Sequence, residues 1–302
     1  MHSILRNLMG VAWWLGAQAV LANSCLVSGG TSLSPTNFAG YLSHETCDEF
    51  VLQDGWYSFP NLARPGITIR AEHAGKAQIA NGFAIDAAGV TIDGISRDGE
   101  KGAIAVRAPG ATIKNCRFSN FGKTSYGEAV WIWDESLSAD GITVVANNTF
   151  DDWGGAPASA CVIIGTAQDA RHVMDKISVH VLNNRFVHGP TAEQKPQGGN
   201  SAIQAFDPFL ASGNYIDTVN GPAIQNKTTN SKISGNTIVN CTGWGALYNR
   251  AFGGNQWIGN VVMHSDVGFD VFQGDPFCSR TTSSMTSNTS GISRISEAER
   301  TT

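Results

Sequence analysis

Short apolar runs rich in β-branched residues recur along the chain, and glycine or asparagine separates them. In one recurring phrase, Asn precedes a variable residue and then an aliphatic or aromatic residue, as in Asn148-Thr149-Phe150 and Asn236-Thr237-Ile238. A second phrase keeps step with the first, as in Ala223-Ile224-Gln225 and Ala246-Leu247-Tyr248. The second phrase returns about every 22 residues, and a period of this length is typical of a solenoid.

Three short strands per turn of a coil fit this period. The chain is therefore predicted to be an all-β, right-handed, single-stranded parallel β-helix. One turn cannot bury its own apolar face, so the turns must stack to form a continuous core. Equivalent Asn residues should then stack at the bends and hydrogen-bond from turn to turn. A leucine-rich solenoid has repeats of similar length, but its Leu-x-x-Leu-x-Leu pattern is missing here.

The region before Asn115 follows the same plan. Ile67–Ile69, Val90–Ile92 and Ala111–Ile113 are predicted strands that keep about the same period. A small helix within residues 37–48 is expected to cap the N-terminal end of the coil. Such a cap is needed because the first turn would otherwise expose its core and its unpaired backbone.

The two ends of the chain differ from the repeats. Residues 1–22 have the features of a secretory signal peptide, with Arg6 before an apolar run that is too short to span a bilayer comfortably. Residues 23–278 form the predicted catalytic β-helix domain, and residues 279–302 a flexible tail rich in Ser and Thr. We therefore expect a secreted monomer, extracellular or periplasmic, with no membrane contact once the signal peptide is cleaved.

The composition and the cysteines argue against two classes of site. The 302 residues carry a formal net charge of −5, which lacks the basic footprint of a nucleic-acid binder. None of the six cysteines lies in a Cys-x-x-Cys pair, so a zinc site has no support. Cys25 and Cys47 flank the expected cap and are a plausible disulfide. Cys116, Cys161 and Cys241 lie in strand-like runs, where they suit small buried apolar positions.

Strand alternation places polar side chains on an outer face of the second phrase. These candidate substrate-binding residues are Gln204, Gln225, Tyr248 and Asp270. Lys227 and Arg250 should be neighbours on the same face, one rung or about 4.8 Å apart. Arg250 should lower the pKa of Lys227 and favour its neutral form, which can serve as a general base. The alternative is a pair of solvated surface cations with no special role.

At these residues the chain resembles polysaccharide lyase family 6, the group of alginate lyases and chondroitinase B. The resemblance covers roughly residues 35–275, and three stretches carry it: the early Ile67–Glu72, then Pro222–Thr228, then Tyr248–Ala251. It implies that Lys227 is the base and Arg250 the acid or charge stabiliser of a β-elimination. In that reaction the base removes the C5 proton of a uronic acid, and the 4-O-glycosidic bond breaks.

Two departures from the family bear on cofactors. The family's calcium-binding acidic residue corresponds to Pro222, and Asn220 stands where a second acid would lie. The His that follows the family's arginine corresponds to Ala251. These residues favour an enzyme without a metal or other cofactor over one that uses Ca²⁺.

The predicted function is therefore a secreted lyase that cleaves an anionic, uronate-containing polysaccharide, with alginate favoured. One alternative is a non-catalytic glycan-binding or cell-surface β-helix. Another is a glycoside hydrolase or epimerase on the same scaffold, which would need clustered carboxylates. The acids near the cationic rungs are Asp207, Asp270 and Asp275.

Two further clusters have both a functional and a structural interpretation. Trp131 and Trp133 could stack on sugar rings, or an N-terminal loop could cover them. Asp151 and Asp152 could bind calcium, although a turn rich in Asp and Gly is the commoner explanation.

Overall fold

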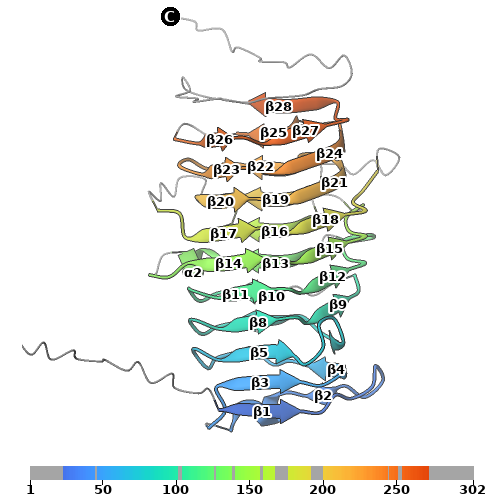
Figure 1. Cartoon of the computed structure of the whole chain (residues 1–302), viewed down its shortest axis with the longest axis vertical. Coiled ribbons are helices and arrows are strands. Elements are labelled where there is room, and N and C mark those ends of the chain that lie inside the picture. Colours follow the sequence, from blue (N-terminus) through green and yellow to red (C-terminus); the bar gives the residue numbers. More distant parts are fainter. Residues whose placement is uncertain are drawn as a thin grey trace, which may run out of the picture.

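The protein is a tall stack of short strands (Figure 1). The computed structural model describes residues 23–44, 46–100, 104–125, 127–137, 140–156, 159–166, 176–191, 200–243, 245–250 and 254–271. The expected signal peptide, the expected Ser/Thr-rich tail and Asp275 lie outside these ranges. Within the described part of the chain, no helix is long and apolar enough to cross a membrane.

Three parallel sheets form the walls of the stack in the described residues. The first sheet contains, in order, β1 (Ser24–Val27), β3 (Glu49–Leu52), β5 (Thr68–Ala71), β8 (Thr91–Asp93), β11 (Thr112–Lys114), β14 (Thr143–Ala146), β17 (Val179–Leu182), β20 (Phe209–Ser212), β23 (Lys232–Ser234) and β26 (Gln256–Ile258). The second contains β2 (Thr36–Asn37), β4 (Gly55–Ser58), β6 (Ala77–Ile79), β9 (Ser96–Asp98), β12 (Arg117–Ser119), β15 (Thr149–Asp151), β18 (Arg185–Val187), β21 (Tyr215–Asn220), β24 (Thr237–Thr242) and β27 (Val261–Met263). The third contains β7 (Phe83–Ile85), β10 (Ile104–Val106), β13 (Glu128–Ile132), β16 (Ala160–Ile164), β19 (Ser201–Ala205), β22 (Ile224–Asn226), β25 (Gly245–Asn249) and β28 (Val267–Val271).

From β5 onward each coil contributes one strand to each sheet, whereas the first two coils contribute only to the first and second sheets, so neighbours within a sheet are consecutive coils. The fold is the predicted parallel β-helix. The early strands are also confirmed, because Ile69 pairs with Ile92 and Ile92 pairs with Ile113 in register. Identical apolar side chains thus lie above one another, which is what stacking of the repeats requires.

The core runs through the centre of the coil. Phe118, Phe150 and Phe186 stack along it, with ring centroids 5.3 and 4.6 Å apart. Cys161 on β16 and Cys241 on β24 are buried free thiols, as the sequence indicates. A small apolar side chain at these positions lets each coil close over its neighbour without leaving a void.

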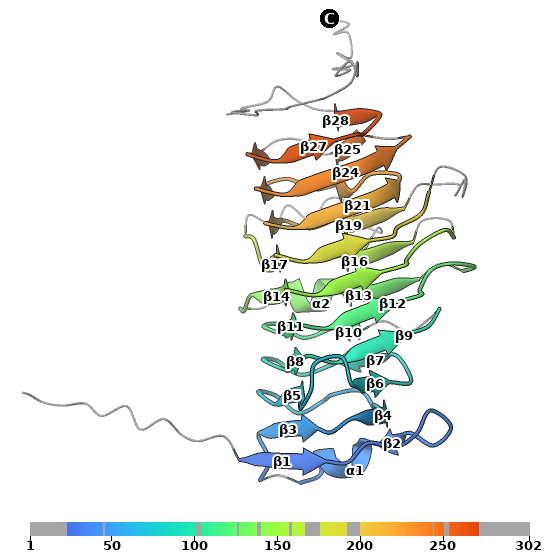
Figure 2. The same ribbon diagram turned by 45° about the vertical axis from the view of Figure 1, so that its right-hand side comes forward.

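A short helix closes the N-terminal end of the coil. Helix α1 (Ala39–Leu42) lies beside β1 at the lower end of the solenoid in Figure 2. The preceding residue, Phe38, is fully buried, and its ring lies 4.6 Å from that of Phe59. The Cys25–Cys47 disulfide ties β1 to the segment after the helix. Both the cap and the disulfide were expected, although the helix itself has only four residues. Helix α2 (Asp134–Leu137) follows β13.

An asparagine ladder occupies the bend between the first and second sheets. Its members are Asn148, Asn184, Asn214, Asn236 and Asn260. The backbone N–H and the Nδ2 amide of each of the first four donate to Oδ1 of the Asn in the next coil, at 2.8 to 3.1 Å. The predicted coil-to-coil bonding of equivalent asparagines is therefore confirmed, and it satisfies buried polar groups that would otherwise be costly.

The ladder begins at Cys116, whose N–H donates to Oδ1 of Asn148 at 2.9 Å. The prediction that Cys116 lies within a strand is therefore wrong, because this residue lies in the bend before β12. Cys116 takes the place that Asn has in the later coils, so the Asn phrase is changed to Cys116-Arg117-Phe118 at this bend. The residue before it, Asn115, has a φ of 56°, a left-handed conformation that Asn tolerates better than most residues.

Candidate functional site

The outer face of the third sheet carries the predicted site. Ile203 and Ile224 are fully buried and Leu247 is 3% exposed, so these side chains face the core as expected. Asn226 is also fully buried, and its Nδ2 donates to Oδ1 of Asn249 at 3.0 Å. The side chains between these inward positions must therefore point away from the core.

The four candidate substrate-binding residues form one column across this face. Gln204 pairs in register with Gln225, Gln225 with Tyr248, and Tyr248 with Asp270. Nε2 of Gln204 donates to Oε1 of Gln225 at 2.7 Å. Gln225 is only 9% exposed and Tyr248 only 2%, whereas Gln204 and Asp270 are partly exposed. Alternation thus gave the direction of each side chain, but it could not show how closely the neighbours cover it.

The pKa of Tyr248 depends on its burial and on its charged neighbours. Burial raises the pKa of its phenol; the charge of Arg250 opposes that shift and the charge of Asp270 adds to it. Because the neutral phenol is favoured, Tyr248 can donate a hydrogen bond at neutral pH but is a poor base.

Lys227 and Arg250 are adjacent, each at the first position after its strand. The N–H of Lys227 donates to the carbonyl oxygen of Ala205, and the N–H of Arg250 donates to that of Asn226, both at 2.8 Å. Backbone bonding of this kind places Arg250 one rung above Lys227, as the sequence predicts. Lys227 is partly buried and Arg250 is exposed.

The Lys227 amine is placed in surroundings that favour its neutral form. Burial lowers its pKa to about 8, and the positive charge of Arg250 contributes in the same direction. Nζ lies 4.5 Å from the centre of the Phe206 ring, a cation–π contact that opposes this shift because it favours the ammonium. In the described residues, no carboxylate forms an ion pair with Lys227 that would restore the charged form. The predicted effect of Arg250 is present, but burial is the larger cause.

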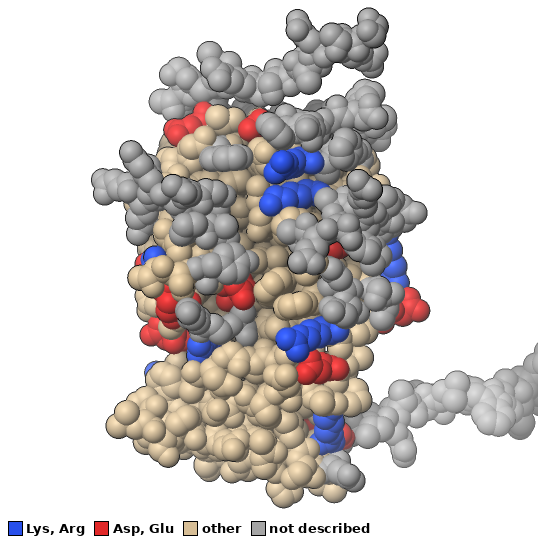
Figure 3. Space-filling model, turned by 180° about the vertical axis from the view of Figure 1, so that it is seen from behind, with Lys and Arg blue, Asp and Glu red and all other residues tan. Residues whose placement is uncertain are grey.

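The position of Lys227 recurs in every lower coil. The first residues after the third-sheet strands follow one another upward. The N–H of each donates to a carbonyl oxygen of the coil below, and for Asp86 at the base this acceptor is the carbonyl oxygen of Leu62. They are Asp86, Arg107, Trp133, Gly165, Phe206, Lys227 and Arg250, and we call them the third-sheet file. Figure 3 shows this face, where Lys and Arg side chains lie one above another along the solenoid. Sequence reasoning missed Arg107, although its place directly after β10 matches that of Lys227 after β22.

Trp131 and Trp133 lie lower on this face. Their ring centroids are 4.5 Å apart, and both side chains are partly exposed. The indole N–H of Trp131 donates to the carbonyl oxygen of Gly165 at 3.2 Å, whereas the buried indole nitrogen of Trp133 has no hydrogen-bond partner among the described residues. Both rings therefore remain candidates for contact with a ligand.

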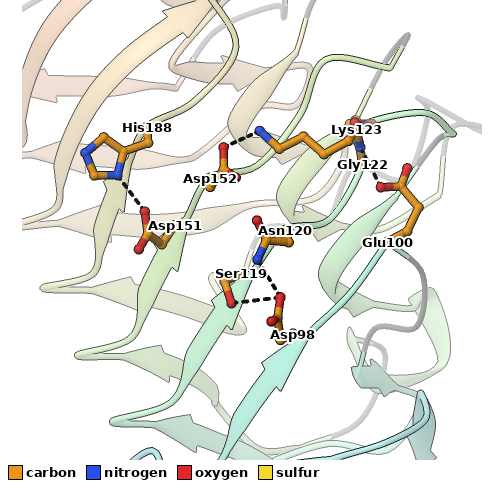
Figure 4. A network of polar contacts seen from close by, with 10 residues as sticks. Asp98, Glu100, Ser119, Asn120, Gly122, Lys123, Asp151, Asp152 and His188 are labelled. Carbon is orange, nitrogen blue, oxygen red and sulfur yellow. Dashed lines mark hydrogen bonds and ion pairs between the residues drawn. The ribbon is translucent and has the colours of Figure 1, made fainter.

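A second group of charged residues lies at the ends of the second-sheet strands (Figure 4). Asp98 accepts hydrogen bonds from Ser119 and from Nδ2 of Asn120. Glu100 accepts the N–H groups of residues 123, 124 and 125 at 3.0, 2.6 and 2.8 Å. Burial raises the pKa of Glu100, but these backbone donors outweigh it and lower the pKa to about 2. Both carboxylates thus tie their own coil to the next coil along the chain.

Asp151 and Asp152 complete this group, which we call the second-sheet network. Asp151 forms ion pairs with Arg117 and with Nδ1 of His188, the latter at 2.6 Å. Asp152 pairs with Lys123. Among the described residues, no group of three or more His, Cys, Asp or Glu side chains could hold a metal ion. The structural interpretation of Asp151 and Asp152 as turn residues is therefore preferred to a calcium site.

The remaining acids do not extend the site in the described residues. Asp207 is only 4% exposed, and the side chains of the acidic residues in α2 lie outside the description. No protein-family model matches the chain, and no curated protein matches it either. A function for this protein must therefore be inferred from its own residues.

Proposed function

We propose that the protein is a secreted lyase that cleaves an anionic, uronate-containing polysaccharide by β-elimination, with alginate as the favoured substrate. The observation that carries this proposal is the Lys227 amine, partly buried and one rung from Arg250. With a pKa of about 8, about one amine in ten is neutral at pH 7. An ordinary lysine with a pKa of 10.5 would be neutral in fewer than about one molecule in a thousand.

The two side chains have distinct parts in the reaction. Neutral Lys227 takes the C5 proton of the uronate, and the electron pair left at C5 forms the C4–C5 double bond as the C4–O bond breaks. The departing oxygen takes a proton from water or from the Lys227 ammonium. Arg250 stabilises the negative charge that develops on the uronate carboxylate. A guanidinium does not release its proton in proteins, which favours charge stabilisation over the role of acid.

The Cys25–Cys47 disulfide supports the proposal that the protein acts outside the cytosol. Disulfides persist in oxidising compartments, and extracellular polysaccharides are met there. The signal peptide expected in residues 1–22 fits the same location.

A non-catalytic glycan-binding protein is the second candidate. It is favoured by the burial of Gln225 and Tyr248, two of the four side chains expected to hold the substrate around the reacting bond. A site with fewer polar contacts can still bind a polyanion through its cations, but it positions the C5 proton less well.

The test is the ultraviolet absorbance of the unsaturated uronate while the purified protein is incubated with alginate, pectate, chondroitin sulfate or dermatan sulfate. Wild type is compared with Lys227→Met, and with Lys232→Met as a matched control, because Lys232 is an exposed lysine on the first sheet. We expect absorbance to rise on one substrate, to stay flat with Lys227→Met, and to be unchanged with Lys232→Met or a calcium chelator. A flat trace for wild type together with measurable polymer binding would replace the lyase by the glycan-binding protein.

A further inference from the structure

The lower part of the third-sheet file combines aromatic rings with a cation. Trp133 stacks on Trp131, and the Arg107 guanidinium carbon lies 5.3 Å from the centre of the Trp133 ring. Arg107 is 46% exposed at its side chain and lies 3.6 Å from Asp86, a long ion pair at the surface. Such an exposed pair contributes little to stability, so Arg107 can redirect its charge to a ligand at small cost.

The same combination occurs at the upper part of the file, where Phe206 lies beneath Lys227 and Arg250. From Arg107 upward the file reads Arg107, Trp133, Gly165, Phe206, Lys227 and Arg250, so two aromatic rings lie between the lower cation and the upper pair. Pyranose rings present C–H groups that stack on indole faces, and uronate carboxylates pair with cations. The file thus matches, in both respects, the chemistry of a polyuronate chain running along the solenoid.

We propose that Arg107, Trp131 and Trp133 form a remote subsite for the anionic polysaccharide, three to four rungs below the reacting bond at Lys227. This inference rests on the proposed function, because it assumes that a polyuronate binds at Lys227 and Arg250. With rungs about 4.8 Å apart, Trp133 lies roughly 14 Å and Arg107 roughly 19 Å from Lys227.

The remote subsite makes chain length a determinant of affinity. An oligosaccharide that covers only Lys227 and Arg250 gains nothing from the tryptophans. A chain that also reaches Trp133 and Arg107 joins two contacts through one backbone, so its second contact forms at a high effective concentration. KM should therefore fall in a step once the oligosaccharide is long enough to span the two regions, while kcat changes less.

The experiment measures kcat and KM over a size series of oligosaccharides for wild type, Trp133→Ala and Arg107→Gln. The matched control is Trp56→Ala, since Trp56 is a partly exposed tryptophan on β4 of the second sheet. We expect Trp133→Ala and Arg107→Gln to raise KM for long chains by roughly three- to tenfold and to leave KM for the shortest substrate unchanged. Trp56→Ala should change neither. Arg107→Gln alters an exposed side chain, so it remains informative if Trp133→Ala folds poorly.

A second measurement separates this inference from the lyase proposal. Polymer binding is measured by calorimetry in the Lys227→Met background, where turnover is expected to be at least about a hundredfold slower. Weaker polymer binding on adding Arg107→Gln supports the subsite even if wild type releases no unsaturated product. Lyase activity with a KM that is independent of chain length, and unaffected by both substitutions, would overturn the subsite and leave the lyase standing. Absence of any polymer binding would overturn both.

Discussion

The second-sheet network and the third-sheet file place charged side chains at the same kind of position, at or just beyond the end of a strand, with opposite results. In the network each carboxylate has a partner in an adjacent coil, as Asp151 has in Arg117 and Asp152 in Lys123. In the upper file a lysine lies beside an arginine, and among the described residues no carboxylate pairs with that lysine. The two regions therefore differ in the surroundings of their charges: ion pairs in the network, and a neighbouring like charge at Lys227 in the file.

The two regions also shift titrating groups for different reasons. Backbone donors stabilise the charged form of Glu100 in the network, whereas burial and a like charge destabilise the charged form of Lys227 in the file. The first arrangement lowers the free energy of the folded state and the second raises it. Shifts of the second kind cluster at functional sites, which makes Lys227 the first residue to test.

The largest expected effect separates the two regions by activity. Lys227→Met should lower kcat by about 10²- to 10⁴-fold, because it removes the proton acceptor but keeps most of the apolar side chain. Its melting temperature should stay the same or rise, since the repulsion with Arg250 is lost. Lys123→Met in the network serves as the control and should leave kcat unchanged. Equal losses of kcat in both variants would break the comparison.

The pH dependence of activity sharpens the comparison between the two regions. Burial and Arg250 both disfavour the ammonium, so the pKa of Lys227 falls to about 8, and deprotonation occurs at lower pH than for a free lysine. Activity should therefore rise about tenfold per pH unit below pH 8 and level off above it. In Arg250→Gln the inflection should remain below 10.5, because burial is the larger cause. Steady-state kinetics between pH 6 and about 10 would reveal a flat profile if Lys227 were not the base.

Acid unfolding tests the pKa shift of Glu100 in the network, which favours the charged form, whereas the shift of Lys227 favours the neutral form. The folded pKa of Glu100 is about 2 and its ordinary value is 4.5, so its contribution to stability is full above pH 4.5 and is lost as the pH falls toward 2. Glu100→Gln should lower the free energy of unfolding at pH 7 by about 1 kcal/mol, a figure reduced for solvent screening. Urea titrations at pH 7 and pH 3 should show a smaller difference between the two proteins at the lower pH. A constant difference would contradict the role of the carboxylate charge.

The smallest effect is expected for the exposed pair of Lys123 and Asp152. Asp152→Asn should change the free energy of unfolding by less than about 1 kcal/mol, and raising the salt concentration should reduce that change. Urea denaturation at low and high salt measures it. A loss of several kcal/mol would mean that the network has a larger part in holding the coils together than its exposure indicates.

The sequence predicted the features that repeat and missed those that depend on local packing. Recurrence of the Asn phrase was enough to expect the ladder, although insertions make its early spacings longer. The nearly equal spacing of the second phrase was enough to bring Lys227 beside Arg250. The burial of Gln225 and Tyr248 depends on which neighbours cover them, and a period of two carries no information on that point. Arg107 was missed because the repeat was aligned only over the later coils.

The asparagine ladder has a direction, and this gives the solenoid two unlike ends. The backbone N–H of Asn148, Asn184, Asn214 and Asn236 donates to Oδ1 of the Asn in the coil above, so these acceptors belong to the next coil along the chain. The Nδ2 amide bonds in both directions, because it donates to that Oδ1 and also to a carbonyl oxygen of the coil below. Detaching the coil that contains Asn260 therefore leaves the backbone N–H of Asn236 without its acceptor, while Nδ2 keeps the carbonyl oxygen of Ala211. A coil added or lost at this upper end thus makes or breaks a backbone hydrogen bond of the coil beneath it.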